Sequence, residues 1–327
     1  MKRKNTYDSK LLEIVNLNTH FFTSNGVVKA VNGMNLHVKE GEILGLVGES
    51  GSGKTITGYS VLGLIDYPGR IVSGEILFKN ENLLKFDKNA LRNLRGNTIS
   101  MIFQDPMMTL NPVLRIDTQM IDTVIAHQKL NKRTARKMSQ EILEKLGVDS
   151  PKHRLNSYPH ELSGGMRQRV AIGISLINKP DLIIADEPTT ALDVTIQSQI
   201  IFETQKLCRE FGTAIVWVTH DLAIVAGLAD RICVMYAGRD VEQGNVNDII
   251  DRPKHPYTKG LINSIPGHNK RKEKLFQING SPPSLTDTDE SCSFYNRCKK
   301  SKIKCKTDSI ENYFENDRSF RCFYPYN

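Results

Sequence analysis

Short apolar runs bounded by glycine, proline and charged residues make up most of the hydrophobic pattern of this 327-residue chain. Apolar and polar side chains alternate from about residue 11, and Asn25 followed by Gly26 is a hairpin signal. This part of the chain predicts antiparallel strands joined by a tight turn. Residues 182–185 and 214–218 are continuous apolar runs, well short of the ~18 residues that a membrane helix needs. Such runs are typical of buried parallel strands.

The hydrophobic pattern becomes helical between residues 105 and 180. Residues 134–146 would place their apolar side chains on one side of a helix, and Gly147 is a signal for its C-terminal cap. Strands and helices then alternate again as far as Met235. We therefore expect an α/β core that is interrupted by a helical insertion.

Composition narrows the class of protein. Hydrophobic residues make up 39% of the chain and charged residues 24%, which is ordinary for a soluble globular protein. The length suits one large domain or two modest ones. Basic and polar residues follow Met1 where a secretory signal would have an apolar segment, so we expect a cytosolic chain.

The formal net charge of +8 would suit a nucleic acid or the anionic face of a membrane as partner. Much of the positive charge lies near the C-terminus, at Lys270, Arg271, Lys272, Lys274, Lys299, Lys300, Lys302, Lys304 and Lys306. No aromatic platform or recognition-helix pattern accompanies these residues. We therefore expect a solvated basic surface and no nucleic-acid partner.

A complete phosphate-binding loop follows a predicted strand at residues 42–47 and leads into a helix near Lys54. Its eight residues are Gly48, Glu49, Ser50, Gly51, Ser52, Gly53, Lys54 and Thr55. Glycine lets backbone N–H groups close around phosphate oxygens without interference from a Cβ atom. Lys54 supplies a positive charge for the β- and γ-phosphates, and Thr55 offers a hydroxyl to Mg²⁺. The loop predicts a nucleoside-triphosphate site.

Two further apolar strands end in polar residues. Asp186 and Glu187 follow residues 182–185, and two adjacent carboxylates at this place are unlike a solvated acidic turn. Asp186 is placed to hold Mg²⁺ directly or through water, and Glu187 to act as general base on the attacking water. His220 ends the strand at residues 216–219, although a lone histidine is more often structural than catalytic.

A second phosphate-binding element lies more than a hundred residues after the loop. Ser163, Gly164 and Gly165 begin a helix and offer backbone N–H groups to a phosphate. If this segment lies on a separate lobe, it cannot reach the nucleotide held by its own chain. A second copy of the fold is then implied.

These motifs, in this order between residues 11 and 244, resemble the ATP-binding subunits of ABC transporters. The resemblance implies an α/β fold with a P-loop ATPase core, an antiparallel β subdomain and a helical insertion at about residues 105–180. It also implies roles for single residues. Gln104 would sense Mg²⁺ and the attacking water, His220 would contact the γ-phosphate, and Asp193 would cross the seam between two subunits.

The same resemblance requires an aromatic residue that stacks on adenine ahead of the phosphate loop. Phe21 ends the first predicted strand and is our choice, with Phe22 beside it as the second candidate. A structural role for both rings in the core stays open.

Finer motifs resemble the dipeptide and oligopeptide importer ATPases, and most closely the D-type subunit of dipeptide permeases. They are GESGSGK (residues 48–54), LIDYPGR (64–70), FQDP (103–106), DEPTTALD (186–193), YAG (236–238) and HPYT (255–258). The resemblance implies an ABC ATPase domain at residues 11–251 and a small, irregular, cysteine-rich C-terminal extension at residues 252–327. It also implies a second, non-identical ATPase subunit, two transmembrane permease subunits and, indirectly, an extracytoplasmic peptide-binding protein. The chain would then be a peripheral protein at the cytoplasmic face of the inner membrane.

Six cysteines are unevenly distributed along the chain. Cys208 and Cys233 lie in apolar segments and are expected in the core. The other four fall within the last forty residues, at Cys292, Cys298, Cys305 and Cys322.

The spacing of these four cysteines is not that of the common zinc modules, and a cytosolic location argues against disulfides. Four thiolates can hold an iron–sulfur (4Fe–4S) cluster or zinc, and free thiols are the third interpretation. The family resemblance implies the cluster, which would stabilise an extension with few apolar residues.

The sequence thus predicts an ATPase subunit in which ATP binding closes a dimer and hydrolysis reopens it, driving peptide import. The alternative is a soluble non-transport ABC ATPase that acts on nucleic acid or ribosomes. Such proteins usually carry long coiled-coil insertions or two ATPase cassettes in one chain, and neither is seen in this sequence. A binding module without turnover is disfavoured because Glu187 and His220 are both present. The cargo, whether dipeptide, oligopeptide, nickel or glutathione, is selected by other subunits.

Overall fold

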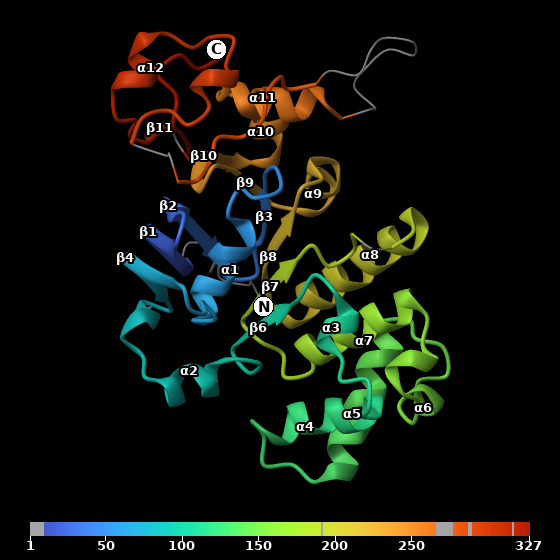
Figure 1. Ribbon diagram of the computed structural model, residues 1–327. Helices are drawn as coiled ribbons and strands as arrows, with labels where there is room; N and C mark the ends of the chain where they lie inside the picture. Colours follow the sequence, from blue (N-terminus) through green and yellow to red (C-terminus); the bar gives the residue numbers. More distant parts are fainter. Residues whose placement is uncertain (1–9, 191, 266–276, 287–289, 316) are drawn as a thin grey trace, which may run out of the picture. The chain divides into compact units, whose positions relative to one another are not determined.

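The computed structural model describes residues 10–190, 192–265, 277–286, 290–315 and 317–327. These residues form two compact units (Figure 1). Phe86–Trp217 form the first, which we call the helical unit. Lys10–Lys85 and Val218–Asn327 form the second, which contains the phosphate-binding loop and which we call the loop unit.

A four-stranded antiparallel sheet begins the loop unit. Its strands, in the order β2-β1-β4-β5, are β1 (Lys10–Thr23), β2 (Gly26–Lys39), β4 (Gly69–Phe78) and β5 (Glu81–Asn82). Thr23 pairs with Gly26 across the turn, so the predicted hairpin is confirmed. A short 3₁₀ helix, η1 (Leu83–Lys85), follows β5.

The second sheet of the loop unit has the order β11-β12-β10-β9-β3. Its strands are β3 (Ile43–Val47), β9 (Arg231–Tyr236), β10 (Arg239–Asn245), β11 (Tyr313–Glu315) and β12 (Arg318–Phe320). Strands β3 and β9 run parallel, and every residue of both is buried. The helices of this unit include α1 (Lys54–Leu62), α9 (Leu222–Leu228), α10 (Val246–Asp251) and α11 (Pro256–Asn263).

The described part of residues 277–327, which we call the C-terminal segment, contains β11, β12, η4 (Tyr295–Arg297) and α12 (Ile303–Thr307). Strand β12 pairs antiparallel with β10. Arg318 forms an ion pair with Glu242, and Arg321 forms one with Asp240, with all four side chains nearly buried. The segment is therefore more regular than the sequence predicts. Buried ion pairs attach it to the sheet, and a hydrophobic pattern carries no signal for such contacts.

The helical unit has three strands, β6 (Ile99–Ile102), β7 (Leu182–Asp186) and β8 (Ala214–Thr219), of which β6 and β7 are parallel. The last two residues of β8 belong to the loop unit. Between β6 and β7 the chain forms α3 (Pro106–Thr109), α4 (Ile116–Ile125), α5 (Lys132–Lys145), α6 (Pro151–Arg154), η2 (Pro159–Glu161) and α7 (Gly164–Leu176). This run confirms the predicted helical insertion. The other helices are α2 (Lys88–Leu94) and α8 (Val194–Phe211).

Helix α5 shows how the local sequence sets an element. Asn131 caps its N-terminus, where its side chain accepts a hydrogen bond from the N–H of Thr134. Ile142 and Leu143 are buried, and Gly147 follows the helix with a positive φ of 67°. The predicted helix and its glycine signal are therefore confirmed. No helix in the described part of the chain is long and apolar enough to cross a membrane.

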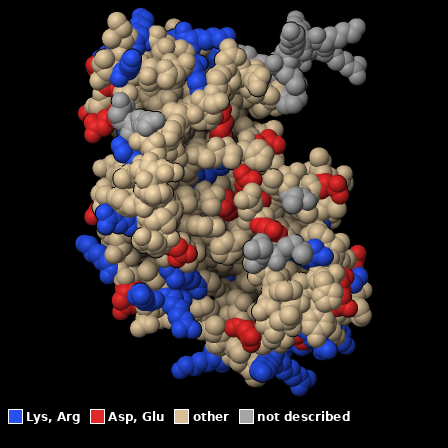
Figure 2. Space-filling model, viewed as in Figure 1, with Lys and Arg blue, Asp and Glu red and all other residues tan. Residues whose placement is uncertain are grey.

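On the face shown in Figure 2, Lys and Arg side chains form separate groups with Asp and Glu between them. Several lysines near the C-terminus pack over aromatic rings. The ammonium of Lys300 lies 4.2 Å from the ring centre of Tyr326, and that of Lys302 lies 4.6 Å from the ring centre of Tyr324. These contacts bind the end of the chain to itself. Residues 270–274, also part of the predicted basic tail, lie outside the described residues.

Candidate functional site

The phosphate-binding loop lies between β3 and α1 in the loop unit, as predicted. A Cβ atom at Gly48 would lie 2.2 Å from the carbonyl oxygen of Met235, so the neighbouring strand leaves no room for a side chain. Gly53 has a φ of +99°, and a Cβ there would lie 2.2 Å from the carbonyl oxygen of Ala30. Only glycine fits both positions, and this brings the backbone of the loop close to its supporting strands.

Lys54 is buried at the start of α1. Its ammonium donates hydrogen bonds to the carbonyl oxygens of Gly48 and Glu49, each at 2.9 Å. The charge is therefore held against the loop that would surround the phosphates. Ser50 and Gly51 are exposed, Ser52 is buried and Thr55 is half-buried.

The predicted catalytic carboxylates lie at the end of β7 in the helical unit. Asp186 is the last residue of the strand and is buried. Glu187 follows it with a φ of 44°, which is uncommon for a residue other than glycine. The chain therefore turns sharply directly after the buried Asp186.

Gln104 and Glu187 are 83 residues apart in sequence and meet in the structure. The side-chain amide of Gln104 donates to Oε2 of Glu187 at 3.2 Å, and the hydroxyl of Thr190 donates to the same oxygen at 3.1 Å. The two donors orient the carboxylate that we predict as the general base. Sequence reasoning missed Thr190, although the residue lies within the quoted run at 186–193.

Ser163 caps helix α7, and its Oγ accepts a hydrogen bond from the N–H of Met166 at 3.3 Å. Ser163 and Gly164 are exposed, whereas Gly165 is buried. The segment therefore presents the start of a thirteen-residue helix at the surface, which is suited to an external phosphate. Asp193 is exposed at the N-cap of α8.

His220 lies exposed directly after β8, at the place that the sequence predicts. Phe21 is half-buried, and a Cβ added at Gly69 would lie 2.6 Å from its ring. Phe22 is exposed, with the guanidinium of Arg70 4.2 Å from its ring centre. Both aromatic residues are thus packed against neighbouring groups, and the adenine-stacking residue stays a prediction.

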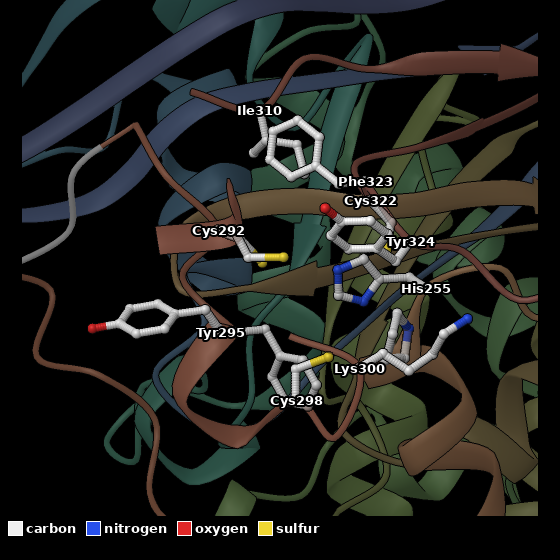
Figure 3. A pocket seen from close by; sticks show the side chains of 12 residues that line it. His255, Cys292, Tyr295, Cys298, Lys300, Ile310, Cys322, Phe323 and Tyr324 are labelled. Carbon is white, nitrogen blue, oxygen red and sulfur yellow. The ribbon is translucent and has the colours of Figure 1, made fainter. Parts of the chain in front are cut away.

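The four C-terminal cysteines line one narrow pocket. The side chains of Cys292, Cys298 and Cys322 come from separate stretches of chain and lie around it near His255 and Tyr324 (Figure 3), and Cys305 also lines it. Burial, together with the neighbouring cysteines, raises the pKa of the Cys292 thiol to about 11 and that of Cys322 to about 12. The thiols are therefore grouped where an uncompensated thiolate is unfavourable.

A metal centre is not confirmed. Among the residues that the structure describes, no group of three or more His, Cys, Asp or Glu side chains is arranged to hold a metal ion. The six cysteines are all free, and Cys208 and Cys233 are buried in the core as predicted.

Two protein families match successive parts of the sequence. The ABC transporter family matches residues 31–190, and the C-terminal region of the oligopeptide/dipeptide transporter family matches residues 241–305. The oligopeptide transport ATP-binding protein AppD of Bacillus subtilis is 45% identical over 96% of this chain and 97% of its own length. The chain belongs to the ATP-binding subunits of the ABC transporters.

Other members of this ATPase family support the assignment. The dipeptide transport ATP-binding protein DppD of Escherichia coli is 41% identical over 96% of this chain and 97% of its own length. The ATP-binding cassette MJ0796, solved as a dimer with ADP and Pi, superposes with a TM-score of 0.65 at 28% identity, covering 72% of this chain and 98% of that one. ATP hydrolysis coupled to transport is therefore the activity of this family, and the soluble alternative is not favoured.

Proposed function

We propose that this chain is the ATP-hydrolysing subunit of a peptide importer. One observation supports this proposal above the others. The chain has a complete set of ATP motifs, and it also matches the C-terminal region of the oligopeptide/dipeptide transporter family. Relatives that match nearly the full chain are named for oligopeptide or dipeptide transport. None of the relatives named above supports a role on nucleic acid or ribosomes.

Each residue of the ATP site would have its own role in hydrolysis. Backbone N–H groups of the loop and the ammonium of Lys54 would bind the β- and γ-phosphates. Thr55, Asp186 and Gln104 would hold Mg²⁺, which neutralises charge on the phosphates when it is bound. Glu187 would accept the proton of the attacking water, since its carboxylate is already oriented by Gln104 and Thr190.

The remaining positions would act on the ends of the nucleotide. Phe21 would stack on adenine, and His220 would contact the γ-phosphate. Ser163, Gly164 and Gly165 would face the nucleotide of a second ATPase subunit, and Asp193 would lie at the seam. We propose that the second subunit is a non-identical chain.

In the cell this arrangement requires membrane partners. We propose that two permease subunits hold the ATPase pair at the cytoplasmic face of the inner membrane, with an extracytoplasmic peptide-binding protein delivering the cargo. Residues 11–251 would form the ATPase domain, and residues 252–327 would form an extension found in this group of transporters.

Purification from native membranes tests the assembly. A tagged copy of the chain should recover a second ATPase and two permeases, which an untagged strain should not yield. Recovery of this polypeptide alone, from membranes in which it is abundant, would contradict a transporter role.

We also propose that Cys292, Cys298, Cys305 and Cys322 bind a 4Fe–4S cluster. The donor set supports this, because the four cysteines line one pocket and burial raises the pKa values of Cys292, Cys298 and Cys322. Such thiols become favourable ligands only when a cation stabilises the thiolates. The same four thiolates could instead hold a zinc ion, and the metal content of the purified protein distinguishes the two.

Anaerobic purification tests the cluster. The protein should be brown with broad absorption near ~400 nm, and Cys298→Ser should remove the colour and expose the C-terminal segment to protease. Cys208→Ser is the matched control, since this thiol lies in the core, and it should keep the colour. Anaerobic protein with stoichiometric zinc, or with no bound metal, would overturn the cluster.

A further inference from the structure

The phosphate-binding loop contains an acidic residue that is paired with the C-terminal segment. Glu49 accepts two hydrogen bonds from the guanidinium of Arg297, one from Nη1 to Oε2 at 2.8 Å and one from Nη2 to Oε1 at 3.0 Å. Only 6% of the Arg297 side chain is exposed. This fork-to-fork pairing fixes both the position and the charge of the Glu49 carboxylate.

Further contacts fix the two partners in place. Arg297 also donates from Nη1 to the hydroxyl of Tyr236 at 3.2 Å and from Nε to the carbonyl oxygen of Asn279 at 3.0 Å. The N–H of Glu49 donates to the hydroxyl of Tyr257 at 3.0 Å. Both the backbone and the side chain of Glu49 are therefore held by residues far along the chain.

The supporting residues form a packed aromatic group. The rings of Tyr236 and Tyr257 lie 4.6 Å apart between centres, and each also contacts Phe294 from the C-terminal segment. Pro282, Pro283 and Leu285 line a small pocket together with residues 49–52. Several parts of the C-terminal segment thus support one side of the phosphate-binding loop.

The charge of Glu49 makes this contact relevant to nucleotide binding. ATP brings several negative charges into a loop that already contains a carboxylate, and like charges in a partly buried site repel strongly. Arg297 compensates the carboxylate, and its planar fork also sets where the loop backbone lies.

We propose that Arg297 is a positioning residue for ATP binding, which acts by neutralising Glu49 and fixing the phosphate-binding loop. The C-terminal segment therefore completes the nucleotide site. The inference rests on the ATP site of the family and does not depend on the cargo or on a metal at the cysteines.

The test is the dissociation constant for ATP, measured by calorimetry on the purified full-length chain. Arg297→Gln should weaken ATP binding about tenfold, because it leaves Glu49 as an uncompensated charge beside the phosphates. Arg297→Lys keeps the charge but loses the paired hydrogen bonds, and should weaken binding by about threefold. Lys306→Gln is the control. It removes an exposed positive charge from helix α12 of the same segment, and it should bind ATP like the wild type.

The same measurement in a Glu49→Gln variant separates the loss of charge compensation at Glu49 from general damage to the fold. In Glu49→Gln protein, the further change Arg297→Gln should alter the dissociation constant by less than about twofold, because no carboxylate remains to be neutralised. Equal losses in both backgrounds, or a loss for Lys306→Gln as large as that for Arg297→Gln, would overturn the proposal. Unchanged binding in Arg297→Gln and Arg297→Lys would overturn it as well.

Discussion

At the level of single residues, Glu187 has an uncommon backbone conformation and a carboxylate that accepts two hydrogen bonds. Its φ of 44° follows directly after the buried Asp186, and the side chain receives hydrogen bonds from Gln104 and Thr190. Strained positions of this kind persist where the surrounding structure holds them, and they are frequent at active sites. The chain thus turns directly after the buried Asp186, and two hydrogen bonds hold the neighbouring Glu187 carboxylate.

Glu187→Gln should keep ATP binding and lower kcat by about 10²–10⁴-fold, because the amide accepts a hydrogen bond but cannot take the proton of the water. The measurement is steady-state phosphate release by the assembled transporter together with ATP binding. Glu141→Gln removes a carboxylate from the exposed side of α5 and should leave both values unchanged. An unaltered kcat in Glu187→Gln would remove the general-base role.

We predict that His255 makes the stability of the loop unit depend on pH. Burial lowers its pKa to about 3, and its Nδ1 accepts a hydrogen bond from the N–H of Tyr257. The unfolded chain binds a proton below about pH 6.5, whereas the folded chain does so only near pH 3, so acidification favours unfolding in this window. Between pH 6.5 and pH 5 the loss should be about 2 kcal/mol.

Thermal unfolding of the full-length chain at several pH values measures this effect. His255→Asn keeps an acceptor for the helix N-terminus but has no titrating ring, so its unfolding temperature should fall less steeply with acid. The same slope in wild type and variant would show that His255 does not titrate in this way.

At the level of helices and strands, β9 lies so close to the phosphate-binding loop that Gly48 cannot be replaced by a residue with a side chain unless the loop moves. Gly48→Ala would force a methyl group to within 2.2 Å of the Met235 carbonyl oxygen, and the loop would have to move. ATP binding should weaken by about tenfold or more, because the backbone donors of the loop lose their positions. Gly227→Ala is the control, since nothing lies within 4 Å of the added methyl group and the change is in helix α9. Equal ATP affinity in the two variants would contradict this account of the loop.

Elements and motifs with a local signal could be predicted from the sequence. The hairpin after β1, the strand before Gly48, helix α5 and the helical insertion all follow from apolar spacing and turn residues. The pairing of β12 with β10 and the contact of Arg297 with Glu49 could not be predicted in this way. Glu49 and Arg297 are 248 residues apart, and nothing in the local sequence of either residue indicates its partner. Glu49 itself gave one indication of such a partner, because a carboxylate within a phosphate-binding loop is stabilised by a positive charge nearby.

At the scale of the whole molecule, the chain joins an ATPase core to a C-terminal segment that contributes both the cysteine pocket and Arg297. Strand β12 and its buried ion pairs attach this segment to the sheet that carries the phosphate-binding loop. The segment is thus part of the nucleotide-binding unit. Cys292 and Cys298 lie close to Arg297 in the sequence, so one short stretch of chain contributes both to the pocket and to the support of the loop.

ATP hydrolysis by this chain is expected to drive peptide import. The most direct test is uptake of labelled di- and oligopeptides into proteoliposomes that contain this chain, its copurifying ATPase and permeases, with ATP on the cytoplasmic side and the binding protein on the other. The wild-type complex should accumulate peptide only with ATP, and the Glu187→Gln complex should accumulate none although it still binds ATP. Peptide accumulation that is equal in the two complexes, or ATP turnover by the wild type without any peptide accumulation, would contradict a role of this chain in powering peptide import.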